Sequence, residues 1–555
     1  MQDPEGQPTR RLHGQGEPLL APDASAAIEA FDAIGTLDAP AALAAINALI
    51  DERGFSPAAE AFAANNDFAA PTFGRLFPGL PPFQPPSELL IELGAAMADP
   101  DTRVNIPQLP EPTADDSTIP SGFTYFSQFV DHDITLDPTI GFPPSVDPDN
   151  LISGRTPTLD LDSVYGLGPE ENPQFYDPDF PASEARFKQG TTTPVPDVTP
   201  GSPLLPSFPN DLPRIGGQSA DRRQAVIPDL RNDENLVIAQ LSLAFMKFHN
   251  KLMDEQPECA EGETLFETVR RLVRWHYQWI VLNDFLPRVV DPAVLADVCG
   301  NGRRFYTFEE DPGTPFMPVE FSVAAYRMGH SMVRNSYSFN RIFTLQLPGG
   351  PVTRGVATLD QLFLFTGARG LGGLVDTLPS NWIIDWRRFF QLGGPPVFPI
   401  PARKIDSRLA FSLRNVPDVS PQEPVSLASR NLLRGRLIGL PTGQCVTTAM
   451  KEMPLTPAQI AGGPEGDIVV AHGFDLQTPL WFYLLREAIV QGQGNRLGAI
   501  GSRIVAEVFV GILQGDPRSF LVMQPDWTPT VPAATPGTFT MADLLRYVND
   551  INPLG

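Results

Sequence analysis

The feature that most constrains how this chain can fold is its proline content, because 61 of its 555 residues are proline, about twice the usual share. Proline fixes φ, lacks an amide hydrogen and disfavours helix in the preceding residue, so it ends helices and favours extended chain. Helical patterns still recur between the proline-rich stretches, whereas strand-like alternation is rare and short. The sequence therefore predicts a mostly α fold, with helices joined by long irregular connections and little β-structure.

Apolar periodicity and capping signals locate the expected helices. They fall at 87–98 with Ser87 as N-cap, 123–135, 234–256, 263–285, 320–334, 357–366, 426–435, 475–490, 496–514 and 541–549. Residues 136–228 are rich in proline, aspartate and glycine, which predicts irregular chain. An irregular stretch of this length inside a compact domain is usually functional.

Composition also divides the chain. Residues 1–22 are polar and without period, which predicts a disordered N-terminus, and residues 23–69 predict an Ala-rich helical extension. Residues 70–555 predict one large domain. The start of the chain lacks the apolar core of a secretory signal. No window of 18 apolar residues is present, so we expect no membrane span.

The net charge narrows the range of possible binding partners, whereas the cysteines do not identify a compartment. The formal net charge is -25 and the pI is about 4.6, which argues against a nucleic acid partner because phosphate binding needs a basic surface. The cysteines are Cys259, Cys299 and Cys445. Three cannot all pair within one chain, so we interpret them as structural or free, and they leave the compartment undecided.

A polar site is indicated in the segment FTYFSQFVDHDIT at 123–135. Gln128, Asp131 and His132 stand at positions i, i+3 and i+4, which places them on one face of a helix. Polar groups flanked by phenylalanines are typical of a site in an apolar pocket. A solvated polar helix face is the alternative interpretation.

This segment resembles the distal helix of the animal haem peroxidase (peroxidase–cyclooxygenase) superfamily, and four further segments resemble motifs of that family in the family's order. They are TPTLDLDSVYG at 156–166 (calcium loop), DLRNDENL at 229–236, YRMGHSMV at 326–333 (proximal helix) and RNLLRGR at 430–436. The resemblance spans roughly residues 70–525. It implies a helical haem peroxidase domain that binds haem b and calcium and uses hydrogen peroxide to oxidise a small electron donor through a ferryl haem.

The resemblance also implies roles for individual residues at the iron. His330 would be the proximal ligand, and Asn431 would hold its other ring nitrogen. On the distal side His132 would take a proton from the peroxide and return it. Arg231 would supply fixed positive charge where the O–O bond splits, and Gln128 would orient a water or a halide.

Other matched residues would contact the edge of the haem. Asp131 and Glu234 match positions that form ester bonds to haem in some family members, so covalent attachment is a hypothesis. Arg327 and Arg434 match residues that pair with the propionates. Asn235 stands where the most oxidising members have methionine, so we do not expect that further linkage.

The resemblance to the calcium loop implies a set of hard oxygen ligands. They are Asp133, Thr156, Thr158, Asp160 and Asp162. Alternation in Thr-x-Thr-x-Asp-x-Asp places its ligands on one side of an extended segment. Asp133 adjoins His132, so bound calcium would anchor the distal helix. A simple acidic turn is the alternative interpretation.

Two other functions stay open. A fatty-acid dioxygenase of the same superfamily would carry a tyrosine three residues before the proximal histidine, but that position is Arg327 and Tyr326 lies four before. One residue turns a helical side chain by about 100°, which disfavours this function. The other is an inactive calcium-bound scaffold or adhesion protein. The presence of His132, Arg231 and His330 argues against it.

The electron donor, the oligomeric state and the compartment are left undecided by the residues. Halide, thiocyanate and phenolic donors all fit the distal set. The family usually has Asp-His-Gly after the last arginine motif, where this chain has Leu437, Ile438 and Gly439, and this favours a divergent, bacterial peroxidasin-like branch. The resemblance also favours a secreted or extracytoplasmic location.

Overall fold

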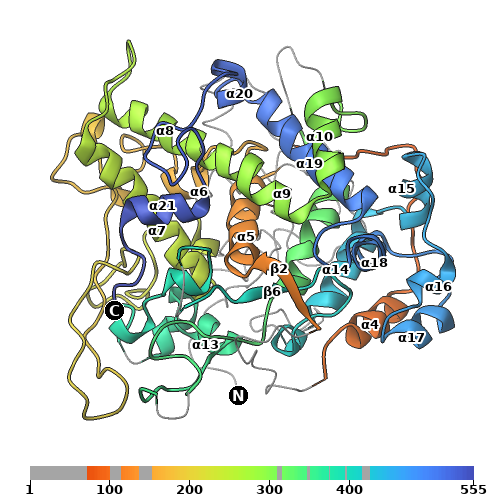
Figure 1. Ribbon diagram of the computed structural model, residues 1–555, viewed down its shortest axis with the longest axis horizontal. Helices are drawn as coiled ribbons and strands as arrows, with labels where there is room; N and C mark the ends of the chain where they lie inside the picture. The colour runs from red at the N-terminus through yellow and green to blue at the C-terminus, as the bar shows by residue number, and fades with distance from the viewer. Residues whose placement is uncertain are drawn as a thin grey trace, which may run out of the picture.

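A computed structural model describes residues 72–100, 114–136, 153–308, 315–346, 350–373, 375–393, 397–415 and 426–555. The predicted disordered segment 1–22 and the predicted helical extension 23–69 lie outside the described residues. The described part is predominantly helical, which confirms the predicted fold class (Figure 1). No helix in these ranges is long and apolar enough to cross a membrane, and all three cysteines are free thiols.

Helix α5 (Gly122–Ile134) lies at the centre of the molecule and packs on α7 (Leu236–Glu255), which in turn packs on α8 (Leu265–Ile280) (Figure 1). Its phenylalanines join a buried aromatic cluster in which Phe129 stacks on Phe245 at 5.0 Å between ring centroids. Almost every residue of α5 is buried. The polar side chains of this helix therefore cannot be satisfied by bulk solvent and need partners inside the protein.

A second group of helices, α4 (Ser87–Ala96), α14 (Leu427–Ile438) and α18 (Leu480–Gly492), packs together on the other side of α5. Helix α4 crosses α14 so closely that a Cβ on Gly94 would lie 2.4 Å from the Ser429 hydroxyl. The prediction of Ser87 as N-cap is wrong: Pro86 takes that position and Ser87 is the first helical residue. Pro86 makes no side-chain capping hydrogen bond.

The predicted helix at 320–334 is wrong, because this segment breaks into three short pieces. They are α11 (Val319–Ser322), a 3₁₀ turn (Ala325–Met328) and α12 (Gly329–Met332). Ala324 interrupts the helix with φ −129° and ψ −74°. The Ser322 carbonyl accepts a hydrogen bond from the Arg327 side chain at 2.9 Å. In a continuous helix this carbonyl would accept a hydrogen bond from a backbone amide of the next turn instead.

The other predicted helices are present with shifted ends, and short ones were missed. Helix α7 begins two residues late, after a 3₁₀ turn at Leu230–Asp233, and α8 gives way to a π turn at Val281–Phe285. The remaining helices are α6 (Asp162–Tyr165), α9 (Leu286–Val289), α10 (Pro292–Asn301), α13 (Leu359–Leu364), α15 (Gly443–Ala449), α16 (Pro457–Ile460), α17 (Gly466–Ala471), α19 (Ala499–Gly515), α20 (Phe520–Met523) and α21 (Met541–Val548).

The β-structure of the described residues consists of three two-stranded sheets. Strand β1 (Phe73–Gly74) pairs in parallel with β3 (Met317–Pro318). The antiparallel pairs are β2 (Asp116–Pro120) with β6 (Pro401–Arg403), and β4 (Ser336–Tyr337) with β5 (Ala357–Thr358). This confirms the prediction of little β-structure.

The described part of the proline-rich stretch, residues 153–228, is irregular as predicted and is held by side chains of the helices. Its only helical pieces are α6 and 3₁₀ turns at Pro173–Phe175 and Ala182–Glu184. His249 of α7 is fully buried, with its ring nitrogens 3.0 Å from the Tyr165 hydroxyl and the Ala185 carbonyl. Burial lowers the pKa of His249 to about 4, so this histidine fastens the irregular chain as a neutral ring.

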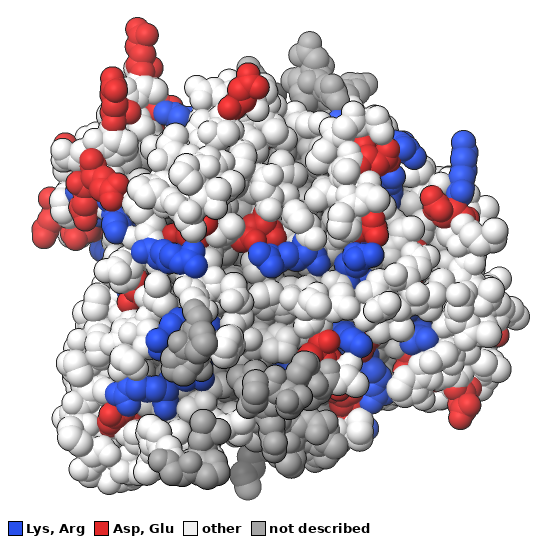
Figure 2. Space-filling model, viewed as in Figure 1, with Lys and Arg blue, Asp and Glu red and all other residues white. Residues whose placement is uncertain are grey.

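The surface charge is unevenly distributed. On the face shown in Figure 2, acidic side chains gather at the upper left edge, around the region of α8 in Figure 1, and basic side chains form a row across the middle. The net charge of -25 therefore does not make this face uniformly acidic.

Candidate functional site

A cavity lies between α5 and the segment that carries the predicted proximal histidine. The empty space between its walls, open solvent included, is about 610 Å³. Residues of α5, including Gln128 and Asp131, form one part of its wall. Another part is formed by Tyr326, Arg327, Gly329, His330 and Val333. Asn235 and four apolar side chains complete it. The structure thus brings Gln128, Asp131 and His330 to one space.

His330 is the second residue of α12 and is held by Asn431 of α14. The two side chains approach at 2.7 Å between His330 Nδ1 and Asn431 Nδ2, and Arg327 Nη1 donates to Asn431 Oδ1 at 3.0 Å. Because Arg327 occupies the amide oxygen, Asn431 presents its N–H to the ring and His330 Nδ1 accepts. For His330 to donate instead, the amide would have to turn over and Arg327 would have to release it.

His132 is fully buried on α5, and its Nδ1 lies 3.0 Å from Asn232 Oδ1. The Asn232 amide nitrogen donates to the Ser163 carbonyl at 3.3 Å, which fixes the oxygen toward the histidine. His132 therefore carries its proton on Nδ1 when neutral. Among the residues that the structure describes, the cavity walls do not include His132.

Arg231 is placed at the carboxyl end of α5. Its guanidinium donates to the His132 carbonyl at 2.8 Å and to the Thr135 carbonyl at 3.0 Å, and it forms an ion pair with Asp229 at 2.7 Å. A cation at this end complements the helix dipole and satisfies carbonyls that lack helical partners. Within the described ranges Arg231 does not line the cavity.

The residues predicted at the haem edge are separated by the fold. Asp131 lines the cavity and its Oδ1 accepts from the Thr135 hydroxyl at 3.1 Å. Burial raises the pKa of Asp131, and the positive charges of Arg327 and Arg231 oppose this. Arg327 lines the cavity too, whereas Glu234 and Arg434 are buried outside the described walls.

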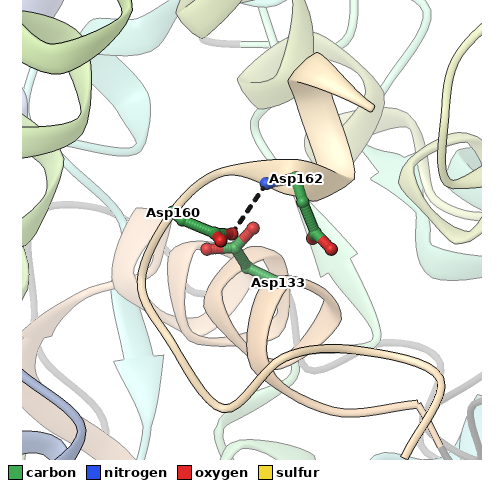
Figure 3. A group of neighbouring side chains, drawn as sticks. All are labelled: Asp133, Asp160 and Asp162. Carbon is green, nitrogen blue, oxygen red and sulfur yellow. Dashed lines mark hydrogen bonds between the residues drawn. The ribbon is translucent and has the colours of Figure 1, made fainter. Parts of the chain in front are cut away.

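The predicted calcium ligands form one cluster beside the end of α5 (Figure 3). One carboxylate oxygen from each of Asp133, Asp160 and Asp162 lies within 4.8 Å of the others. Figure 3 shows the Asp133 and Asp160 carboxylates facing each other, with Asp162 beside them at the start of α6. The Thr156 hydroxyl lies 2.9 Å from that of Thr158 and 3.4 Å from Asp160 Oδ2.

The electrostatics of this cluster favour a cation. Burial and the charges of Asp160 and Asp162 raise the pKa of Asp133 well above its ordinary value. Burial and Asp160 also raise the pKa of Asp162 to about 7, although Arg155 opposes the shift. A divalent ion with hard oxygen ligands would relieve this repulsion. Asp162 Oδ1 is buried and has no hydrogen-bond partner among the described residues, so the donor set fits such an ion.

A buried arginine that the sequence interpretation missed connects this cluster to α5. Arg155 Nη1 lies 3.1 Å from Asp162 Oδ2, and Arg155 Nη2 lies 2.7 Å from Asp229 Oδ2. Asp229 in turn holds Arg231. Arg155 directly precedes the Thr-x-Thr motif, but its partner lies 74 residues away, so local spacing gave no signal for the link.

Part of the chain matches a known protein family. The sequence model of the family described as animal haem peroxidase matches residues 142–347. This segment, which is less than half of the chain, is similar to the animal haem peroxidase family. The matched segment includes Asp160, Asp162, Arg231 and His330, while α5 and Asn431 lie outside it.

Individual relatives of this chain are distant. Heme peroxidase 2 of Caenorhabditis elegans is 26% identical over 389 residues, which are 64% of this chain and 47% of that protein. The chain thus spans about half or less of the length of the curated relatives it matches. Peroxidase A of Dictyostelium discoideum has a similar fold, with a TM-score of 0.56 at 16% identity over 88% of this chain and 94% of that one.

A fatty acid alpha-dioxygenase of Oryza sativa also shares the fold. Its TM-score is 0.51 at 12% identity, over 85% of this chain and 78% of that one. At such low identities the likeness shows the fold alone.

Proposed function

We propose that this protein is a haem-dependent peroxidase, which uses hydrogen peroxide to oxidise a small electron donor such as a halide, thiocyanate or a phenol. The observation that carries the proposal is the His330–Asn431 pair on a cavity wall that faces the polar side of α5. Iron ligation through Nε2 needs the proton on Nδ1 and an acceptor beside it, and the Asn431 amide would supply that acceptor once it turns over and its oxygen faces the ring.

The residues around the cavity fit haem b. His330 would hold the iron, and Asn431 would fix the ring through Nδ1. Arg327 would pair with a propionate, as would Arg434 if the cofactor reaches it. When bound, haem would supply the iron at which peroxide is reduced. Asp131 lines the cavity, which supports an ester bond there better than at Glu234.

The residues around α5 would take up the proton of the peroxide and return it. With its proton on Nδ1 facing Asn232, His132 has Nε2 as the nitrogen that can take a proton from peroxide and return it. Arg231 would act through its positive charge and by holding the His132 carbonyl. Gln128 Nε2 is buried with no partner among the described residues, and it would orient a water or a halide.

We propose that Asp133, Thr156, Thr158, Asp160 and Asp162 hold calcium. The close carboxylates and the buried Asp162 oxygen support this role. Since Asp133 is the neighbour of His132 on α5, a bound ion would fix the helix end that positions the distal histidine.

The test is haem reconstitution in the presence of calcium, followed by visible absorption spectra with and without hydrogen peroxide. We expect a Soret band that shifts with peroxide, and its loss or unresponsiveness in His330→Ala. His472→Ala is the matched control, because His472 pairs with Glu92 away from the cavity. Absence of haem uptake by the parent would refute the proposal and favour a calcium-bound scaffold.

A fatty-acid dioxygenase is the second candidate, because Tyr326 lines the same cavity as His330. Its hydroxyl donates to the Ser127 carbonyl at 3.2 Å. One similar solved structure is a rice fatty acid alpha-dioxygenase variant with palmitic acid, at a TM-score of 0.53. Oxygen consumption with palmitic acid that Tyr326→Phe abolishes, without a response to peroxide, would put this function first.

A further inference from the structure

Three arginines gather beside the loop that carries two of the proposed calcium ligands. Arg270 and Arg274 stand one turn apart on α8, so their side chains share a helix face. The Arg270 guanidinium lies 5.1 Å from the centroid of the Tyr165 ring. Arg518, between α19 and α20, contacts Asp160 Oδ2 through Nη2 at 3.2 Å. We call Arg270, Arg274 and Arg518 the arginine cluster.

The segment after α19 is fastened to α8 beside this cluster. Trp275 Nε1 donates to the Arg518 carbonyl at 3.0 Å, and the Phe520 amide donates to Gln278 Oε1 at 3.1 Å. Asp516 Oδ1 accepts from the Arg518 amide at 2.9 Å and lies 3.4 Å from Arg518 Nε. The fold therefore places a carboxylate among the arginines.

Two of the arginines and this aspartate each keep a polar atom without a partner. Arg270 Nε, Arg274 Nε and Asp516 Oδ2 are buried and have no hydrogen-bond partner among the described residues. Arg274 is only 7% exposed and Asp516 only 1%. Arg271 on the same helix shows the contrast, because its Nε and Nη2 donate to Glu263 at 2.8 Å. Buried charged groups with unused hydrogen-bonding atoms are costly and rare, which points to a ligand.

The charges of the cluster favour an anion. Burial and the charges of Arg270 and Arg518 lower the pKa of Arg274 to about 10. Asp516 and Asp160 oppose this shift. The guanidinium stays charged at neutral pH, so a bound anion would relieve the repulsion between the arginines.

The unused atoms specify the chemistry of the ligand. The Nε–Nη edge of a guanidinium presents two parallel N–H donors, which match the oxygens of an oxyanion. An ionised Asp516 can only accept, so the ligand must also carry a hydroxyl that donates to Oδ2. Hydrogenphosphate has both kinds of atom, whereas sulfate and the dianion of a phosphate monoester have no hydroxyl to donate.

The cluster can be reached from solvent. The Arg518 side chain is 33% exposed. A Cβ built on Gly168 would lie 3.8 Å from Arg270 Nη1 and would meet no other listed neighbour within 4 Å, so there is room beside that guanidinium.

We propose that Arg270, Arg274 and Asp516 bind inorganic phosphate between α8 and the segment after α19. The two arginine edges hold its oxygens, and its hydroxyl donates to Asp516 Oδ2. None of these residues lines the cavity of the proposed peroxidase, so the site is separate from the one proposed for haem.

The test is calorimetric titration of the full chain with inorganic phosphate at pH 8, with sulfate and methyl phosphate in parallel. Phosphate monoesters have a second pKa of about 6, so methyl phosphate is then a dianion. We expect phosphate to bind at least about tenfold more tightly than either. Arg270→Met and Arg274→Met should each raise the Kd for phosphate at least about tenfold. Arg271→Met is the matched control, because Arg271 already holds Glu263, and it should bind as the parent does.

Asp516→Asn tests the hydroxyl. Its oxygen can still accept from the Arg518 amide, while a donating nitrogen replaces Oδ2, so the preference should shift from phosphate toward sulfate. A parent that binds no phosphate, or binds sulfate equally well, would overturn the inference, and so would Arg274→Met with the Kd of the parent. If Arg274→Met does not fold, Arg274→Lys takes its place, since lysine keeps the charge and loses the two parallel donors. A parent that takes up no haem would refute the proposed function and leave this titration valid.

Discussion

Replacing Asp229 by asparagine should strongly destabilise this protein, because Asp229 joins two buried arginines at the end of α5. Its Oδ2 accepts from Arg155 Nη2 and from Arg231 Nη2, both at 2.7 Å. The three side chains are only 6–7% exposed. Arg231 also donates to the His132 and Thr135 carbonyls. Loss of the Asp229 carboxylate would therefore also affect the end of α5, which lies beside the cavity.

The magnitude follows from the bonds that asparagine cannot make. An amide nitrogen in place of Oδ2 would face two guanidinium groups that also donate. Two charge-assisted hydrogen bonds would be lost, at roughly 1.5–3 kcal/mol each. Removing one partner of a buried ion pair typically costs about 3–5 kcal/mol. We therefore expect Asp229→Asn to lower the free energy of unfolding by about 4 kcal/mol at pH 7.

The effect should depend on pH in a defined direction. Burial alone would raise the pKa of the Asp229 carboxyl, but Arg231 and Arg155 outweigh it and hold the pKa well below its ordinary value. A carboxyl with a lowered folded-state pKa stabilises above its unfolded pKa, about 3.9, and loses this contribution as pH falls through the folded value. The difference between parent and variant should thus be full at pH 7 and shrink below about pH 4.

Urea denaturation followed by far-UV circular dichroism measures the change. The matched control is Asp254→Asn, since Asp254 pairs with Arg186 at 3.0 Å but is 70% exposed. An exposed pair is worth less than about 1 kcal/mol. A free energy of unfolding within about 1 kcal/mol of the parent for Asp229→Asn, or an equal loss in the exposed control, would contradict this expectation.

Three further predictions concern the ion site, a buried carboxyl and the proximal pair. Calcium should raise the thermal midpoint of the parent but not of Asp133→Asn, and an equal rise in both would contradict the assigned ligand. Burial raises the pKa of Glu487 from 4.5 to about 7, so the folded state holds that proton more tightly and stability falls as pH rises through this range. Parent stability relative to Glu487→Gln should drop by up to about 3 kcal/mol between pH 4.5 and 8, and parallel urea-denaturation profiles would exclude this. Asn431→Leu should weaken haem retention about 10–100-fold, measured by haem transfer to an acceptor protein, and unchanged retention would argue against the His330–Asn431 contact.

Features that depend on local spacing were predictable from the residues alone. Helical periodicity and the rarity of strand alternation predicted the fold class, and proline frequency limited the length of the helices. The helical period put Gln128 and Asp131 on one face of α5, and both line the cavity. The acidic cluster was foreseeable because Thr156, Asp160 and Asp162 lie within one short loop, where alternation alone brings their side chains together.

Contacts between residues far apart in the chain could not be predicted in this way. His330 and Asn431 are 101 residues apart, and the resemblance named both without showing that Arg327 occupies the Asn431 oxygen. The helical pattern at 320–334 could not show that the Arg327 side chain contacts the Ser322 carbonyl. Asn235 reaches the cavity because of how α7 packs on α5. Long irregular connections carry no periodicity that fixes where their ends lie, so these contacts follow from packing of the whole domain.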